Sequence, residues 1–220
     1  MVDTLVLGTS GATREGSSPF CDTIKMIKYS NNIQKAIDLA SQLHADQKRV
    51  LTGVPYVSHL FGVAVILNQY TDDEDVVIAG LLHDVLEDVS PSIYNENDLL
   101  RDFNSRILTI VEDVSEKQFD NLTKQKVSWE KRKTDYLNHL ATKSMPESVL
   151  VSMADKYNNW NSILNMLKIK GKLIWLYFNS DQVKQIWFME SYLQVLINLG
   201  YRNHPLFLEL DELIKQIKTF

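Results

Sequence analysis

The chain has 220 residues, enough for a domain with a substantial core, and its 45% hydrophobic and 23% charged residues are typical of a soluble globular protein. A formal net charge of −5 argues against a nonspecific binder of nucleic acid or of membrane surfaces, although a local basic pocket is still compatible with a small phosphorylated ligand. The single cysteine, Cys21, excludes an internal disulfide framework, and without a membrane-length apolar run or a secretory signal pattern we expect a cytoplasmic protein.

Residues 1–28 are predicted to form a poorly ordered N-terminal arm, because they are mostly small, polar and turn-prone. The glycines of this arm are not followed by the GK[ST] sequence of a phosphate-binding loop. From residue 30 onward, apolar residues recur at spacings of three and four, which predicts an amphipathic first helix that ends near residue 47.

The rest of the chain continues this helical pattern. Further helices are predicted over residues 56–70, 72–89 (after an N-cap at Thr71), 97–114, 128–143, 146–167, 181–199 and 205–219, with loops at 48–55 and 116–127. Strand signals are scarce and there is no internal repeat. We therefore predict a single all-α domain over residues 29–220.

One short stretch concentrates polar chemistry inside an apolar run. His83, Asp84, Glu87 and Asp88 follow the apolar residues 76–82. If the helix is continuous, its turn of about 100° per residue places these four side chains on one side of the helix, within an arc of about 140°. Crowded acidic groups repel one another, and a bound cation would remove that repulsion, since imidazole and carboxylate together suit a divalent metal.

Two other segments provide matching side chains. His59 lies where the loop 48–55 enters the next helix, and Asp155 follows an apolar run inside the helix 146–167. A buried aspartate needs a partner or a metal. Asp155, Asn159 and Ser162 are spaced to share one helix face, so a solvated polar stripe is the alternative interpretation.

These residues resemble the H…HD…D order of the HD-domain metal phosphohydrolases, and in particular the hydrolase domain of RelA/SpoT type. The similarity covers roughly residues 30–165, and the matching segments are HADQ at 44–47 (H-x-G-Q), GVPYVSH at 53–59 (G-x-P-Y-x-x-H), HDVLED at 83–88 (H-D-x-x-E-D) and ADKYNN at 154–159 (A-D-[RK]-x-x-N). Asp46 replaces the usual glycine. The resemblance implies an HD-domain helical bundle and a small stand-alone alarmone hydrolase.

The resemblance also implies roles for individual residues. One Mn²⁺ would be held by His59, His83, Asp84 and Asp155, and Glu87 and Asp88 would orient or deprotonate the attacking water. The substrate would be a phosphorylated purine nucleotide, (p)ppGpp, cleaved to GDP or GTP and pyrophosphate. Its base and sugar would contact four further residues: Lys48, Arg49, Asn159 and Ser162. The basic residues 131–133 are a second candidate for phosphate contacts, although a solvated helix start is the interpretation we favour for them.

Three functions are compatible with these motifs. The first is a guanosine alarmone 3′-pyrophosphohydrolase, and the second is an HD phosphohydrolase for another nucleotide, such as an adenosine alarmone. The third is a nucleotide-sensing protein that binds without turnover. The Glu87–Asp88 pair argues against the third, because a binding protein does not need a water-activating pair beside its metal. The sequence does not separate the first two, and it does not define an oligomeric state.

Overall fold

A computed structural model describes residues 28–116, 126–142 and 144–220 of the chain. Within these ranges the regular elements are helices, and an isolated antiparallel bridge joins Lys48 to Pro55. The predicted all-α fold class is therefore confirmed. Residues 1–27 of the predicted arm, and most of the predicted loop 116–127, lie outside the described residues.

Six short helices lie between residues 28 and 116. They are α1 (Asn31–Leu43), α2 (Val57–Leu67), α3 (Glu74–Leu82), α4 (Val85–Asp88), α5 (Glu96–Asp102) and α6 (Ser105–Val114). Side-chain caps define several of their starts: Ser30 accepts a hydrogen bond from the first turn of α1, and Asp73 does the same for α3. The cap of α3 is thus Asp73 and not Thr71 as predicted, because the Thr71 hydroxyl accepts instead from the backbone N–H of Asp73.

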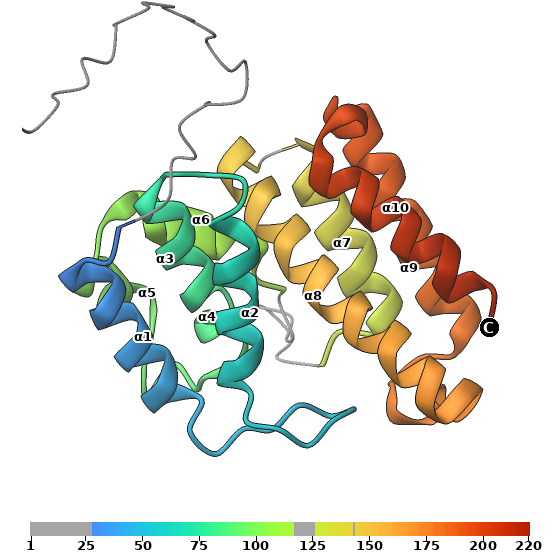
Figure 1. The fold of residues 1–220 in the computed structure, drawn as a ribbon. Coiled ribbons are helices and arrows are strands. Elements are labelled where there is room, and N and C mark those ends of the chain that lie inside the picture. Colours follow the sequence, from blue (N-terminus) through green and yellow to red (C-terminus); the bar gives the residue numbers. More distant parts are fainter. Residues whose placement is uncertain (1–27, 117–125, 143) are drawn as a thin grey trace, which may run out of the picture.

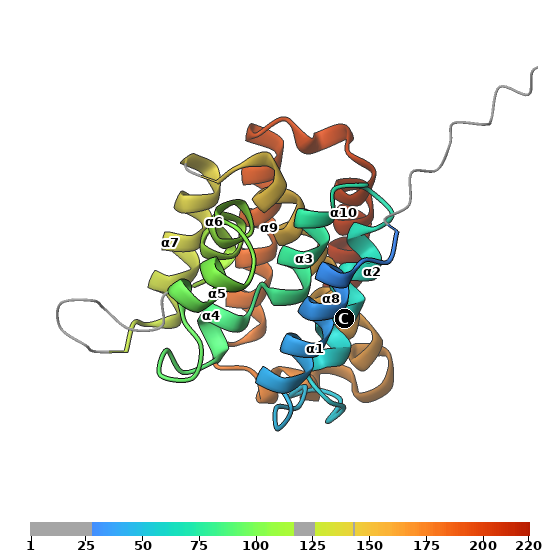
Figure 2. The ribbon, with the colours of Figure 1, turned by 90° about the vertical axis from the view of Figure 1, so that its left-hand side faces the viewer.

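The second half is built on one long helix. Its elements are α7 (Trp129–Thr142), α8 (Pro146–Lys170), the 3₁₀ helix η1 (Gly171–Tyr177), α9 (Gln182–Asn198), η2 (Tyr201–Asn203) and α10 (Pro205–Lys218). Helix α8 contacts α2, α3, α6 and α10, and Figure 1 shows it between the early helices and the C-terminal pair. The view turned by 90° shows α8 behind α1 and α2 (Figure 2). No helix in the described ranges is both long and apolar enough to cross a bilayer.

Two helix predictions need correction. The predicted helix 97–114 is two helices, because the chain breaks at Phe103 and Asn104 caps the new helix α6. The helix α8 continues to Lys170, and the η1 segment after it was not predicted. Gly171 begins that segment with a φ of +60°, a value that favours glycine.

The predicted continuous helix through His83 is also wrong. Helix α3 ends at Leu82, His83 and Asp84 form a turn, and α4 begins at Val85. Asp84 has φ −95° and ψ −2°, in the bridge region that interrupts α-helical geometry. The one-sided arc expected for His83, Asp84, Glu87 and Asp88 therefore does not describe their arrangement.

A buried carboxylate ties three helices together away from this turn. Asp113 on α6 accepts hydrogen bonds from the backbone N–H of Met145 (3.1 Å) and from the Ser148 hydroxyl (2.7 Å), both at the start of α8. Its other oxygen lies 2.9 Å from Nε2 of His139 on α7. The N-cap residue Met145 makes no side-chain hydrogen bond to the first turn of α8. The Asp113 carboxylate from α6 therefore acts as the hydrogen-bond acceptor at this helix N-terminus.

Replacing Asp113 with alanine should destabilise the fold by about 2–4 kcal/mol, because it leaves the buried Ser148 hydroxyl and two partly buried groups, the Met145 N–H and the His139 ring, without their partner. The measurement is urea unfolding followed by circular dichroism. Asp135→Ala is the matched control, since Asp135 makes only an exposed ion pair with Lys131 and should change stability by less than about 1 kcal/mol. Equal effects of the two substitutions would contradict this assignment.

Candidate metal centre and active site

Helix α2 presents His59 with its Nε2 atom toward the protein interior. The ring is buried, and its Nδ1 lies 2.8 Å from Oδ1 of Asn158 on α8. The amide oxygen only accepts, so the proton is assigned to Nδ1 and Nε2 keeps its lone pair. This contact depends on Gly62, one turn further along α2, where an added Cβ would lie 2.3 Å from Nδ2 of Asn158.

The His83 ring is fixed in the same tautomer by its own helix. Its Nδ1 lies 2.9 Å from the carbonyl oxygen of Gly80, which again only accepts, so Nε2 of His83 is also left as an acceptor. Both Nε2 atoms are buried, and among the described residues neither has a hydrogen-bond partner. Two buried lone pairs of this kind need a positive partner.

Asp155 on α8 completes the group. Its Oδ1 lies 3.1 Å from Nε2 of His59 and 3.5 Å from Nε2 of His83, and the ligand atoms of the three residues lie within 4.8 Å of one another. Oδ2 of Asp155 is 2.6 Å from the Lys156 ammonium, and Oδ1 also accepts from the Asn159 amide. These contacts fix the carboxylate so that one oxygen faces the two imidazoles.

Asp84 brings a second carboxylate to the same place. Its Oδ2 lies 3.1 Å from Nε2 of His83 and 3.7 Å from Nε2 of His59. The Tyr56 hydroxyl donates to this oxygen at 2.6 Å. The structure thus brings together all four side chains that the sequence assigned to a metal, from α2, the turn after α3, and α8.

The electrostatics of this group favour a cation. Burial lowers the pKa of the His83 imidazole, but the Asp84 and Asp155 carboxylates outweigh it, so the net pKa lies well above the usual range. Burial opposes the ionisation of Asp155, yet Lys156 and the two imidazoles hold its pKa well below the usual range. Two imidazole nitrogens and two carboxylate oxygens that converge in this way fit a divalent metal ion.

Glu87 and Asp88, on the short helix α4, differ in their surroundings. Oε2 of Glu87 accepts from the backbone N–H of Glu116 at 3.0 Å, and its Oε1 is 4.0 Å from Arg132. Burial raises the pKa of Glu87 to about 8, and the Glu116 and Asp84 carboxylates add to that shift. As a whole residue Asp88 is more exposed than Glu87, but its carboxyl group is partly buried, and this burial together with the nearby Asp84 carboxylate raises its pKa to about 6.

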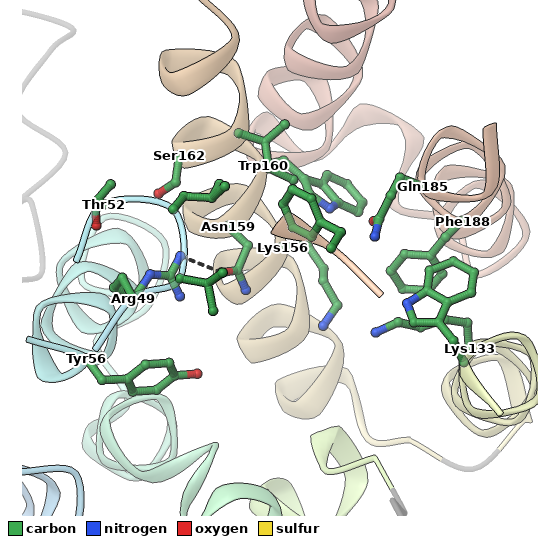
Figure 3. Close-up of a pocket in the computed structure, with 15 residues that line it drawn as sticks. Arg49, Thr52, Tyr56, Lys133, Lys156, Asn159, Trp160, Ser162, Gln185 and Phe188 are labelled. Carbon is green, nitrogen blue, oxygen red and sulfur yellow. Dashed lines mark hydrogen bonds between the residues drawn. The ribbon is translucent and has the colours of Figure 1, made fainter. Parts of the chain in front are cut away.

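A cavity of about 280 Å³ lies beside this centre and contains three of the four residues that the sequence assigned to the substrate. Figure 3 shows Arg49, Asn159 and Ser162 along one wall, where Nη2 of Arg49 donates to Oδ1 of Asn159 at 2.7 Å. Lys48 is exposed, is not among the lining residues, and forms the backbone bridge to Pro55. The structure therefore separates Lys48 from the other three.

Sequence reasoning missed several residues around the centre. Tyr56 belongs to a recognised motif but was given no role, although its ring stacks on His44 and lies under the Arg49 guanidinium at 5.7 Å. The solvated helix start predicted for residues 131–133 holds only for Lys131, which is exposed. Arg132 and Lys133 are half-buried and form ion pairs with Glu116. The spacing of charges along α7 does not reveal this, because Glu116 follows α6 and is not part of α7.

Fold and site together define an HD-domain protein. The family model described as HD domain matches residues 36–170, and the chain belongs to that family. Membership implies a divalent metal, in agreement with the His59, His83 and Asp155 group. The predicted HD-domain fold and the resemblance to the RelA/SpoT-type hydrolase domain are both confirmed.

The similar proteins carry consistent names. A guanosine-3′,5′-bis(diphosphate) 3′-pyrophosphohydrolase of Aquifex aeolicus is 31% identical over 67% of this chain and 20% of its own length. The human protein of the same name, MESH1, is 31% identical over 57% of this chain and 65% of its own length. The chain thus spans about a fifth of the bacterial relative.

Solved structures show the same fold. A metazoan ortholog of SpoT, a protein that hydrolyses ppGpp and has a role in starvation responses, superposes with a TM-score of 0.66 at 26% identity, and the match covers 86% of this chain and 97% of that one. A crystal structure of a Listeria monocytogenes protein superposes with a TM-score of 0.61 at 28% identity over 74% of this chain and 99% of that one.

Proposed function

We propose that this chain is a Mn²⁺-dependent hydrolase that removes the 3′-diphosphate of guanosine 3′,5′-bis(diphosphates) and gives GDP or GTP and pyrophosphate. The observation that carries the proposal is the convergence of buried imidazole and carboxylate acceptors beside a cavity lined by Arg49. The guanosine substrate is favoured by the names of the relatives, which refer to guanosine 3′-pyrophosphohydrolases.

In this proposal, His59, His83, Asp84 and Asp155 hold the metal. Mixed nitrogen and oxygen ligands suit Mn²⁺, which accepts imidazole as well as carboxylate. When bound, the ion supplies Lewis-acid chemistry, stabilising charge on phosphoryl oxygens and lowering the pKa of water. Asn158 and the Gly80 carbonyl keep the two imidazoles in the tautomer that can bind a metal.

The reaction breaks the bond between the 3′ oxygen and its phosphorus, and the oxygen of water forms the new bond to that phosphorus. Glu87 and Asp88 are the groups that orient this water and accept its proton. Glu87 is the stronger candidate for the base, because its carboxylate is buried and held by the Glu116 backbone N–H.

Purified protein incubated with Mn²⁺ and matched guanosine and adenosine 3′-diphosphates tests this function. We expect pyrophosphate and the guanosine 5′-phosphate from the guanosine compounds, no products in excess chelator, and recovery when Mn²⁺ is added back. Binding of all the nucleotides without any product would indicate a sensing protein instead. Faster cleavage of the adenosine compounds would overturn the substrate assignment.

The wall of the cavity that contains Arg49 is proposed to hold the purine, with Asn159 and Ser162 near the sugar or base. A planar guanidinium stacks on π faces better than a lysine ammonium does. Arg49 is already oriented by two contacts, its hydrogen bond to Asn159 and its position over the Tyr56 ring.

Arg49→Ala should therefore raise KM several-fold or more with a smaller change in kcat, because stacking on the base is similar in the ground and transition states. Arg49→Lys should recover only part of the loss. Steady-state kinetics with the guanosine substrate gives both constants. Lys48→Ala is the matched control, since its exposed side chain does not line the cavity, and it should behave like the parent. The reverse ranking of the two alanine variants would reassign the purine contact to Lys48.

A further inference from the structure

The cavity beside the metal centre is lined by positively charged side chains, although the protein as a whole has a negative net charge. Its described lining residues include three cations, Arg49, Lys133 and Lys156, and none of those described residues has a carboxylate. A larger cavity, which Glu87 lines, has the opposite character, because seven of its described lining residues are Asp or Glu. With a chain net charge of −5, this separation directs an anionic ligand into the first cavity.

The three cations come from different elements of the fold. Arg49 comes from the loop before α2, whereas Lys133 comes from α7 and Lys156 from α8. Figure 3 shows Lys133 and Lys156 reaching toward the same part of the cavity, away from Arg49. Gln185 and Phe188 of α9 lie on the same side of the cavity as Lys133. This side is therefore formed by α7 and α9, whereas Arg49 lies on the opposite side.

Both ammonium groups are held in place by packing and by ion pairs. Lys133 lies over the Phe188 ring at 4.7 Å and is paired with Glu116, and Lys156 lies over the Tyr136 ring at 4.8 Å and is paired with Asp155. An ammonium has three N–H donors, and the hydrogen bonds described for Lys133 engage one of them, to Glu116. The like charges of Lys133 and Lys156 repel, and an anion between them would relieve that repulsion.

The shape of the proposed substrate indicates which of its groups could lie between Lys133 and Lys156. A nucleoside bis(diphosphate) has three arms: the 3′-diphosphate, the base and the 5′-phosphates. The metal centre takes the first arm and the Arg49 wall takes the second in the function proposed above. The only cationic side chains among the described lining residues that remain unassigned are Lys133 and Lys156.

We propose that Lys133 and Lys156 form a second anion subsite, which binds the phosphate groups on the 5′ side of the nucleotide. The inference rests on the proposed function for the identity of the ligand. Lys133 is the informative residue to change, because Lys156 also contacts Asp155 and its removal would disturb the metal centre.

The test compares guanosine 3′-diphosphates that differ only at the 5′ position: a hydroxyl, a monophosphate or a diphosphate. For the parent protein, KM should fall as 5′-phosphates are added. In Lys133→Met the KM for the 5′-diphosphate compound should rise about tenfold or more, the effect of losing a charge-assisted contact, while the 5′-hydroxyl compound should be unaffected. Lys133→Arg should retain most of the preference. Lys131→Met is the matched control, since Lys131 is exposed on the same helix and should leave all three values unchanged.

Calorimetric binding of GDP separates the failure of this inference from the failure of the proposed function. GDP has the base and the 5′ arm but no 3′-diphosphate, so its affinity does not depend on turnover. Weaker GDP binding by Lys133→Met than by Lys131→Met supports the subsite, even if no 3′-diphosphate is hydrolysed. Equal losses for all three substrates with unchanged GDP binding would overturn it, and would assign Lys133 the role of positioning Glu116 and, through it, Glu87. Thermal unfolding of each variant checks that the fold is kept.

Discussion

Asp84→Ala is expected to lose Mn²⁺ binding and to hydrolyse no guanosine 3′-diphosphate, while the helical fold stays intact. The substitution removes one of the two carboxylates that face the imidazoles of His59 and His83, whose Nε2 atoms have no hydrogen-bond partner among the described residues. Removing a residue that merely supports a metal ligand typically weakens metal affinity by about 10–100-fold, so loss of a direct ligand should have a larger effect. Asp84 is half-buried at a turn and is not a core residue, so its removal should leave the packing of α3 intact.

Isothermal titration with Mn²⁺ measures the binding directly. Thermal unfolding gives an independent measure, because a ligand at 100 times its Kd stabilises the folded state by about 2.7 kcal/mol. Mn²⁺ should therefore raise the Tm of the parent and leave that of Asp84→Ala unchanged. Asp211→Ala, which removes a carboxylate at the surface of α10, is the control and should respond like the parent. Normal Mn²⁺ binding by Asp84→Ala would exclude Asp84 from the metal centre.

The order of the proposed ligands along the chain was predictable, but their geometry was not. His59, His83 and Asp155 are far apart in the sequence, and only motif resemblance linked them before the structure brought their ligand atoms within 4.8 Å. The helical arc predicted for His83 and Asp84 failed because periodicity assumes an unbroken helix. The break at Asp84 carries no glycine or proline that would have signalled it.

Charged residues were the hardest to place from sequence alone. The helix α8 was predicted from its start at Pro146 and Glu147, and the structure buries it on several sides, including the consecutive residues 151–156. The same reasoning treated Lys133 as solvated, although it lies half-buried against Phe188 and Glu116, partners that are distant in sequence. For Lys48 and Arg49, adjacent in one loop, the sequence favoured Arg49 only because a guanidinium stacks better on a purine, and it did not show which of the two side chains faces the cavity. The backbone bridge from Lys48 to Pro55 leaves the Lys48 side chain exposed and directs Arg49 to the cavity.

The raised pKa of Glu87 bears on its proposed role. A general base is most effective when its pKa lies near the working pH, and burial raises the pKa of Glu87 to about 8. Asp88 is the more exposed of the two residues. These differences favour Glu87 as the group that accepts the proton of water, with Asp88 in the supporting role.

Glu87→Gln should accordingly lower kcat by about 10²–10⁴-fold, the usual contribution of a positioned acid–base group, while Mn²⁺ binding and KM change little. The glutamine carbonyl still accepts from the Glu116 backbone N–H, so α4 should stay in place, but the amide cannot take a proton from water. Steady-state kinetics and Mn²⁺ titration of the same preparation separate these effects, and Glu190→Gln on the surface of α9 is the isosteric control. Asp88→Asn tests the neighbouring carboxylate in the same assay and should cost less than Glu87→Gln. An unchanged kcat in Glu87→Gln together with a large loss in Asp88→Asn would transfer the base to Asp88, and Glu87 would then serve to hold α4 against the Glu116 backbone.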